Sequence, residues 1–243
     1  MKRPLAISLV GLVVFVAIVI ARLPAQWLIP KNAPFSCATL EGTLWAGTCG
    51  GLSAAGQSLG ELSWELRPLA LLRARLGAQV TLIHPAGRVS AEAEVGAGGL
   101  LQARDLHADF ALDPRLMPGL PGQLHGLAHA DLELLALKGG ALTALKGTLE
   151  ARNLEERSGD VTPLGSFAVR FPGGGGEPLG QVHDLGGPLS LEGTLRLPRA
   201  GGYELEALVA ARPGAPPALE NNLRILGTPD EAGRRQLTVS GEF

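Results

Sequence analysis

The sequence is poor in the residue types on which several protein classes depend. It has only two cysteines among 243 residues, which excludes a disulfide-dense scaffold and a four-cysteine zinc site. Aromatic residues make up 4% of the chain, too few for the stacking platforms of proteins that bind single-stranded nucleic acid. Lys and Arg number 21 against 23 Asp and Glu, so the basic surplus of a nucleic-acid binder is absent too. We therefore expect no nucleic-acid partner.

Common catalytic and metal-binding patterns are also scarce. The chain contains no Gly-x-x-x-x-Gly-Lys-Ser/Thr and no His-Glu-x-x-His. His125 and His129 have the spacing of a zinc pair on a helix. On a strand these side chains share a face but lie about 13 Å apart, at ~3.3 Å per residue, which is too far for one ion. We predict a protein that is not an enzyme and that has no catalytic residues, no metal and no cofactor.

A long apolar run opens the chain. Leu5–Ala21 contains Ser8 as its only polar residue. As a helix this run would span roughly 26 Å at ~1.5 Å per residue, against a hydrocarbon core of about 30 Å, and the side chain of Arg22 would reach the headgroups. We predict a cytoplasmic start over residues 1–4, a single transmembrane anchor over 5–23 and an exported β-rich domain over 24–243.

The alternative to an anchor is a signal peptide that is cleaved after export. Ala21–Ala25 reads Ala-Arg-Leu-Pro-Ala, a poor match to a small-x-small cleavage site, which favours the uncleaved anchor. Trp27 follows at the position of an interfacial aromatic residue. Lys2 and Arg3 precede the run, and this basic start places the N-terminus in the cytoplasm.

The two cysteines fit an exported domain. Cys37 and Cys49 both follow the apolar run, on the side of the membrane where disulfides persist. We predict a disulfide between them, which would stabilise the fold by about 3 kcal/mol in the chain-entropy model. Two unrelated buried thiols are the alternative. A redox pair would more often have the spacing Cys-x-x-Cys.

Apolar and polar residues alternate along the exported region with a period of two, which is typical of half-buried strands. The alternation is clear at 123–134, 147–153, 189–197, 203–209 and 236–243, and weaker at 80–83, 88–95 and 105–112. Helix is scarce: Pro68–Leu76 is the best candidate, with Pro at its first position and Gly77 as a stop, and Asp113–Met117 is a shorter one. We predict a mainly β fold, an antiparallel curved sheet with one or two short helices.

One short pattern, Leu then Glu or Lys then Gly-Thr-Leu, occurs three times. Its copies are Leu40–Leu44, Leu145–Leu149 and Leu191–Leu195, separated by 105 and 46 residues, so no fixed repeat exists. We interpret the pattern as one type of strand, with glycine on the crowded inner face and with threonine and charge outward.

Three segments together carry a resemblance to a known family. The first, Ala21–Gly47, begins with Leu-Pro-Ala at the end of the apolar run and finishes with Gly-Thr-Leu-Trp-Ala-Gly. The second, Leu62–Pro68, reads Leu-Ser-Trp-Glu-Leu-Arg-Pro. The third, Leu223–Gly227, reads Leu-Arg-Ile-Leu-Gly and precedes a turn and a strand. In this order they resemble the type II secretion system protein N family, also called general secretion pathway protein N. The motif residues, for which we expect a structural role, are Gly42, Thr43, Leu44, Trp45, Gly47, Trp64, Pro68 and Gly227.

The resemblance implies an accessory protein of the bacterial inner membrane, with its N-terminus in the cytoplasm and the bulk of the chain in the periplasm. Such a protein would support assembly or stability of the machine that exports folded proteins from the periplasm across the outer membrane, in contact with other inner-membrane subunits. No catalytic residues come with the family. The exported domain also looks like the AsmA-like superfamily, whose members are thought to hold lipid in a curved β groove. The apolar strand face is then either a packed core or a lipid groove, and lipid is an alternative partner.

Overall fold

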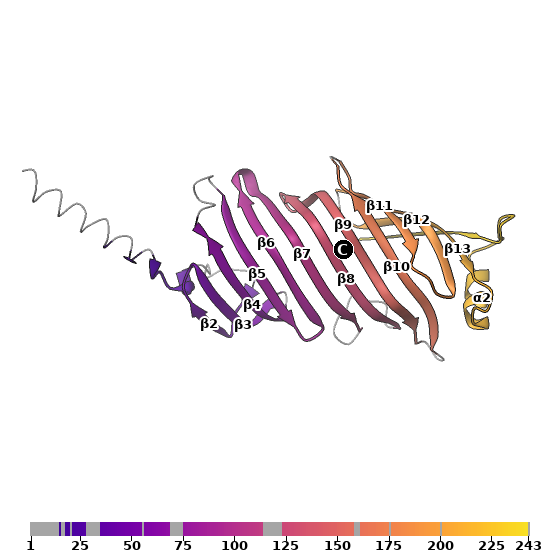
Figure 1. The fold of residues 1–243 in the computed structure, drawn as a ribbon, viewed down its shortest axis with the longest axis horizontal. Helices are drawn as coiled ribbons and strands as arrows, with labels where there is room; N and C mark the ends of the chain where they lie inside the picture. The colour runs from indigo at the N-terminus through magenta and orange to yellow at the C-terminus, as the bar shows by residue number, and fades with distance from the viewer. Residues whose placement is uncertain are drawn as a thin grey trace, which may run out of the picture. The chain divides into compact units, whose positions relative to one another are not determined.

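The computed structural model describes residue 15 and residues 18–19, 21–27, 35–54, 56–68, 75–113, 123–157, 161–174, 176–199 and 201–242. The chain forms two compact units: unit 1 ends at His84 and unit 2 begins at Pro85. Both units consist mainly of antiparallel strands (Figure 1), which confirms the predicted mainly β class. A short α-helix, α2 (Pro217–Arg224), belongs to unit 2.

Unit 1 is built around strand β3. Its elements are η1 (Ala25–Trp27), β1 (Phe35–Ser36), β2 (Thr39–Gly42), β3 (Ala46–Ala54), β4 (Gln57–Arg67) and β5 (Leu76–His84). The shorter strands β1 and β2 pair with opposite ends of β3, while β4 lies between β3 and β5. Cys49 and Leu52 of β3 are buried, as is Ala25 of η1.

Unit 2 is an antiparallel meander in which each strand pairs with the next one in sequence. Its elements are β6 (Gly87–Gly96), η3 (Ala97–Gly99), β7 (Leu100–Leu112), β8 (Leu124–Lys138), β9 (Ala141–Glu156), β10 (Thr162–Pro172), β11 (Leu179–Asp184), β12 (Leu189–Arg196), β13 (Tyr203–Ala211), α2 and β14 (Arg235–Gly241). Figure 1 shows β6 to β13 side by side in chain order. The β14 strand pairs with β13.

The core of unit 2 lies on one face of its sheet, which we call the inner face. Val182, Leu191 and Val209 project from β11, β12 and β13 and contact Leu219 and Leu223 of α2. Val209 is 1% exposed and Leu191 is 9% exposed. The helix therefore covers the inner face next to the last strands of the meander.

A second buried cluster lies on the inner face. It consists of Leu132 on β8, Leu145 on β9 and Phe171 on β10, and Leu195 of β12 packs against it. Gly180 of β11, the register partner of Leu195, leaves room for the Phe171 ring, because a Cβ there would come within 2.8 Å of Phe171 Cε1. The inner face therefore carries two buried clusters along the meander.

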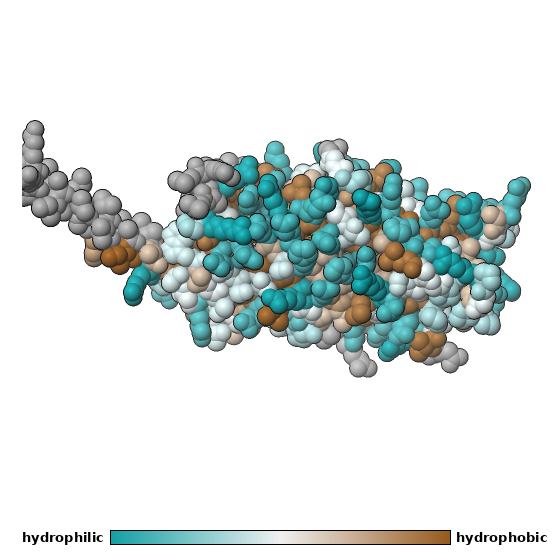
Figure 2. Space-filling view, in the orientation of Figure 1, coloured by the Kyte–Doolittle hydropathy of each residue, from teal (hydrophilic) through white to brown (hydrophobic). Residues whose placement is uncertain are grey.

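The opposite, outer face of the unit 2 sheet is polar. Asp131, Thr148, Arg170, Gln181 and Thr194 are successive register neighbours across β8 to β12. In the view of Figure 2, hydrophilic residues predominate over the strands of this unit. The apolar inner face and polar outer face are the physical origin of the period of two in the sequence.

Strand prediction was more accurate than helix prediction. All eight segments predicted as strands fall on β5–β9 and β12–β14, although Phe243 lies outside the described residues. The end of the helix predicted over Pro68–Leu76 is wrong, because Leu76 is the first residue of β5, and residues 69–74 are outside the described part. Residues 114–117 of the second predicted helix also lie outside the described part. Leu40–Leu44 is not one strand, because β2 ends at Gly42.

The predicted anchor over residues 5–23 lies largely outside the described residues, and the cytoplasmic start over 1–4 lies wholly outside them. Phe15, Ile18, Val19 and Ala21 are helical. Among the residues that the structure describes, no helix combines the length and the apolar composition needed to cross a membrane.

Candidate functional site

Residues Gly42–Gly47, which we call the motif hairpin, join β2 to β3. Gly42 and Gly47 are register partners at the base of the turn. The Thr43 N–H donates to the Ala46 carbonyl at 2.8 Å, and the Ala46 N–H donates to Thr43 Oγ1 at 3.3 Å. Gly42 has a φ of +94°, a conformation that strains any residue with a side chain. A glycine followed by a threonine is therefore what this turn requires.

Trp64 on β4 fixes the motif hairpin from the neighbouring strand. Its Nε1–H donates to the Leu44 carbonyl at 3.2 Å, which gives the indole the acceptor that a half-buried tryptophan needs. Its ring lies against Gly47, where a Cβ atom would come within 2.6 Å of Cζ2. The Leu66 N–H donates to the Trp45 carbonyl at 2.6 Å. Two motifs recognised separately in the sequence thus form one contact.

The motif hairpin also holds the last residue of the predicted anchor and the residue that follows it. The Leu44 N–H donates to the Leu23 carbonyl at 2.8 Å, and Pro24 forms an antiparallel bridge with Thr43. Leu23 and Pro24 are therefore bonded to the motif hairpin.

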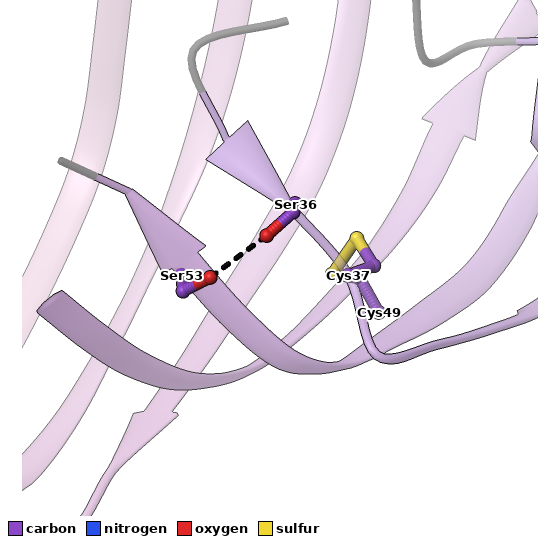
Figure 3. Close-up of a disulfide and its surroundings, with 4 residues drawn as sticks. All are labelled: Ser36, Cys37, Cys49 and Ser53. Carbon is purple, nitrogen blue, oxygen red and sulfur yellow. Dashed lines mark hydrogen bonds between the residues drawn. A yellow bond between two sulfur atoms is a disulfide. The ribbon is translucent and has the colours of Figure 1, made fainter. Parts of the chain in front are cut away.

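A disulfide stabilises the same region. Cys37 and Cys49 are bonded, with Cα atoms 5.5 Å apart and a sequence separation of 12, in agreement with the predicted pairing. Beside the bond, Ser36 Oγ lies 2.8 Å from Ser53 Oγ and links β1 to β3 (Figure 3). The disulfide closes a loop that contains the motif hairpin.

The remaining motif residues lie elsewhere. Pro68 directly follows the last residue of β4. Gly227 belongs to unit 2, where its N–H donates to the Arg224 carbonyl at 3.3 Å just past α2 and its carbonyl accepts a bond from Arg235 Nε at 3.0 Å. The structure therefore gathers six of the eight motif residues around one hairpin.

An open polar groove lies on one face of the unit 1 sheet. Its volume is about 620 Å³. The side chains of one strand face line it, namely Glu41, Thr48, Ser63, Glu65, Gln79 and Thr81. Carboxylates, hydroxyls and an amide in an open groove suit a polar protein surface better than an apolar ligand.

A second groove, which we call the apolar groove, lies on the inner face of unit 2. Its volume is about 340 Å³, and its lining includes Ala108, Phe110, Ala128, Ala130, Leu149, Ala151, Phe167 and Val169. Small alanine side chains on β7, β8 and β9 leave this space between larger neighbours. The inner face is thus a packed core around Leu191 and an open groove across β7 to β10.

An ion pair that sequence reasoning missed organises the turn between β11 and β12. Asp184 Oδ1 lies 2.5 Å from Arg212 Nη2, and the same carboxylate accepts the N–H groups of Gly186 and Leu191 at 3.1 and 3.2 Å. Arg212 also donates to the Gly187 carbonyl at 3.1 Å. The Asp184 side chain is 13% exposed.

These contacts determine the charge of Asp184. Burial is the largest single influence and raises the pKa of the carboxyl group. Hydrogen bonds from the Arg212 side chain and from the backbone of Leu191 and Gly186, together with the charge of Arg212, outweigh it, so the pKa lies below its ordinary value. The Arg212 carbonyl accepts the Ala215 N–H at 3.0 Å in the turn before α2. The ion pair therefore positions the chain that leads into the helix.

The histidines form cross-strand pairs with aspartates. His129 Nδ1 lies 2.6 Å from Asp109 Oδ1, and His107 Nδ1 lies 3.4 Å from Asp131 Oδ1, on β7 and β8. His125 lies on β8 with His129, on a strand as the alternation predicts. In the described ranges, no cluster of three His, Cys, Asp or Glu residues is placed to hold a metal ion.

Sequence reasoning also overlooked one pattern. Gly56–Gly60 reads Gly-Gln-Ser-Leu-Gly, the spacing of a catalytic serine on a turn from a strand into a helix. Here the pattern leads into β4, a strand, and Ser58 is the register partner of Ser53 on β3. The helix that a catalytic serine of this type requires is absent after Ser58, so we assign the pattern to a β-hairpin.

Comparison with known proteins identifies the family. A family model described as "Type II secretion system (T2SS), protein N" matches residues 33–238. The chain belongs to the type II secretion system protein N family. The matched range contains the motif hairpin, the disulfide and most of unit 2, and it confirms the resemblance drawn from the sequence motifs.

Two relatives support the assignment. The chain is 25% identical to the type II secretion system protein N of Aeromonas hydrophila over 256 residues, covering the whole of both chains. It is 35% identical to the type II secretion system protein N of Vibrio cholerae serotype O1 over 83 residues, a third of each chain. No solved structure gives a significant match. Family membership makes the chain a component of the type II secretion system.

Proposed function

We propose that this chain is an accessory inner-membrane component of the type II secretion system, which supports assembly or stability of the machine in contact with other inner-membrane subunits. Its N-terminal apolar run serves as a single anchor, with residues 1–4 in the cytoplasm and residues 24–243 in the periplasm. Family membership supports a role in this machine. The apolar run with its basic start supports the anchor and its orientation.

One observation carries the proposal: the segment that leaves the anchor is bonded to the motif hairpin. The hydrogen bond between Leu44 and Leu23, together with the bridge between Pro24 and Thr43, orients unit 1 with respect to the exit of the chain from the membrane. A fixed junction suits a scaffold that presents its surface to neighbouring subunits at the membrane. The polar groove of unit 1, whose lining includes Gly42 and Gly47 of the motif hairpin, is then a candidate surface for such contacts.

The anchor is tested by topology. We expect alkaline phosphatase fused after Phe243 to be active, because the enzyme folds only in the periplasm, and the full chain to stay in the membrane fraction after carbonate washing. The same enzyme fused after Pro4 serves as the inactive control. A soluble product that begins near residue 26 would refute the anchor.

The accessory role is tested by deletion and complementation. We expect loss of the chain to lower the secretion of folded substrates and the amounts of other inner-membrane subunits of the machine. Trp64→Ala removes both the ring on Gly47 and the bond to Leu44, so it should complement the deletion less well than Trp64→Phe, which keeps a ring. Unchanged secretion and subunit amounts in the deletion strain would count against the role.

The apolar groove favours one alternative, in which unit 2 binds lipid through an acyl chain. A volume of about 340 Å³ lies at the lower end of the range for small-molecule sites, roughly 300–1,000 Å³. Lipid should then copurify with the full chain and be detected by mass spectrometry. Ala130→Leu fills the groove and should abolish copurification, while Thr194→Leu on the outer face should not. Absence of lipid from the unaltered chain would exclude this alternative.

A further inference from the structure

The last strand of unit 2 has an edge that is open within the part of the chain described by the structure. The β14 strand pairs with β13 in an unbroken register from Tyr203–Gly241 to Val209–Arg235. No other described strand pairs with it. One row of its backbone N–H and C=O groups therefore points away from the sheet, available to another strand.

The usual protections of an edge strand are missing from β14. Its seven residues, Arg235–Gly241, contain no proline, and its register with β13 has no bulge. Its single charged residue, Arg235, stands at the first position and donates Nε to the Gly227 carbonyl. By contrast, β1 in unit 1 is only two residues long. Proteins shorten, bend or charge an edge to prevent pairing, so a long regular edge points to a partner strand.

The side chains of β14 are complementary to themselves. We propose that β14 pairs antiparallel with β14 of a second copy of this chain, centred on Thr238. In this register Leu237 faces Val239 of the second copy, and Arg234 faces Glu242 of the second copy at both ends. Arg234 already donates Nε to Asp230 at 3.0 Å, and its guanidinium has further N–H donors for a carboxylate.

The register follows from two constraints. A shift by one residue would place the apolar inner face of one copy beside the polar outer face of the other, because successive side chains point to opposite faces. A shift by two residues would leave two positions of the seven-residue strand unpaired. A pairing centred on Thr238 includes every residue of β14 and makes the inner faces of the two copies continuous. Val239, which is 36% exposed in the single chain, lies on that face.

A single pair of seven-residue strands is a small interface. Stable complexes bury about 1,200–2,000 Å² in total, so we expect this dimer to be weak in dilute solution. Anchoring both copies in one membrane raises their effective concentration; this step, unlike the pairing itself, rests on the anchor in the proposed function. The test is therefore made with the full chain in its native membrane.

Cysteine crosslinking tests both the pairing and its register. Cys37 and Cys49 are bonded to each other, so Thr238→Cys introduces a single free thiol at an exposed position. Opposite residues of an antiparallel pair have Cα atoms about 4.5–5.5 Å apart, inside the range of about 4.4–6.8 Å for a disulfide. We expect mild oxidation to give a dimer of twice the mass on a non-reducing gel, reversed by reductant.

Two neighbouring positions on the same face provide matched controls. Gln236→Cys should not crosslink with itself, because position 236 of the second copy is four residues away, about 13 Å at ~3.3 Å per residue. When chains with Gln236→Cys and Ser240→Cys carry different tags and are coexpressed, a mixed dimer should form, because these positions face each other.

Three results would overturn the proposal. The first is the absence of a Thr238→Cys dimer. The second is equal crosslinking of Gln236→Cys alone, which would indicate random collision. The third is a crosslink to a protein of another mass, which would show that β14 pairs with a different partner. None of them depends on whether the deletion strain secretes normally, so failure of this pairing and failure of the proposed function are distinguishable. A far-UV circular dichroism spectrum of each purified variant that matches the unaltered protein shows that the chain has folded.

Discussion

Replacement of Leu191 by alanine tests whether the inner face beneath α2 is a packed core. Leu191 is 9% exposed and belongs to the cluster formed by Val182, Val209, Leu219 and Leu223. These neighbours come from three elements besides its own strand. A side chain held from so many directions leaves a cavity when it is shortened, because its neighbours relax only partly.

The expected cost follows from the size of the deletion. Leu191→Ala removes three carbon atoms, and at ~0.8 kcal/mol per buried CH₂ the transfer term is about 2.4 kcal/mol. The cavity adds to this, and measured Leu→Ala changes in cores span about 2–5 kcal/mol. The helix is short, and its inward shift would fill part of the space. We therefore expect a loss of about 3 kcal/mol in the free energy of unfolding.

Urea unfolding of the full chain in detergent, followed by far-UV circular dichroism, measures this loss. Hydrogen exchange shows which strands lose stability, and we expect the amides of β12 and β13 to lose protection. Thr194→Ala is the control on the same strand, since Thr194 is exposed on the outer face. A Leu191→Ala chain that unfolds within ~0.5 kcal/mol of the unaltered protein, together with binding of an apolar dye by the folded protein, would refute the packed core.

Three further predictions follow from the contacts described. Thiol labelling of denatured, unreduced protein should modify neither Cys37 nor Cys49, and replacing both by serine should lower stability by about 3 kcal/mol. Asp184→Asn should cost about 1–3 kcal/mol at neutral pH. Because the folded-state pKa of Asp184 is lowered, its stabilising effect is present above the unfolded value of ~3.9 and is lost as the pH falls through the folded-state value, so urea titrations of the two proteins should converge in acid. Gly47→Ala should destabilise unit 1 by about 1–3 kcal/mol, because its Cβ would meet Trp64 at 2.6 Å, and tryptophan fluorescence should report the change.

The strands that were predicted from the sequence are those that face a core on one side and solvent on the other. β10 escaped prediction because its alternation is broken. Pro163 and Gly165 lie near its start, and its register with β9 shifts twice between Pro163 and Phe167. The first shift adds a residue to β10 and displaces its alternation by one, so a strict alternating pattern is lost although the strand continues.

The helix α2 and the ion pair between Asp184 and Arg212 were both missed, but only the helix could have been predicted from the sequence. α2 was predictable, because Pro217 stands at its first position, Leu219 and Leu223 share one helical face, and Gly227 follows. The pair between Asp184 and Arg212 was not, since the partners are 28 residues apart and meet only through the register of β11, β12 and β13. Neither residue has neighbours in sequence that indicate a partner.

The motif hairpin was only partly predictable from the sequence. Sequence reasoning singled out Gly42, Gly47 and Trp64 as structural residues but placed the first two on a continuous strand. The positive φ of Gly42 turns the chain back on itself, and only then does Trp64 reach Leu44. The identities of the residues were visible in the sequence, whereas their contact depends on the turn.

The meander of unit 2 has a consequence for the order in which the protein folds. Every strand from β6 to β14 bonds to the strand next to it in sequence, so each new hairpin closes over a short stretch of chain, and short loops close quickly. A chain delivered across a membrane from its N-terminal end would add strands one at a time to an existing edge. α2 arrives after β13, and only then are Leu191 and Val209 covered. Folding intermediates should therefore have most of their strands formed while the apolar surface beneath α2 is still open to chaperones.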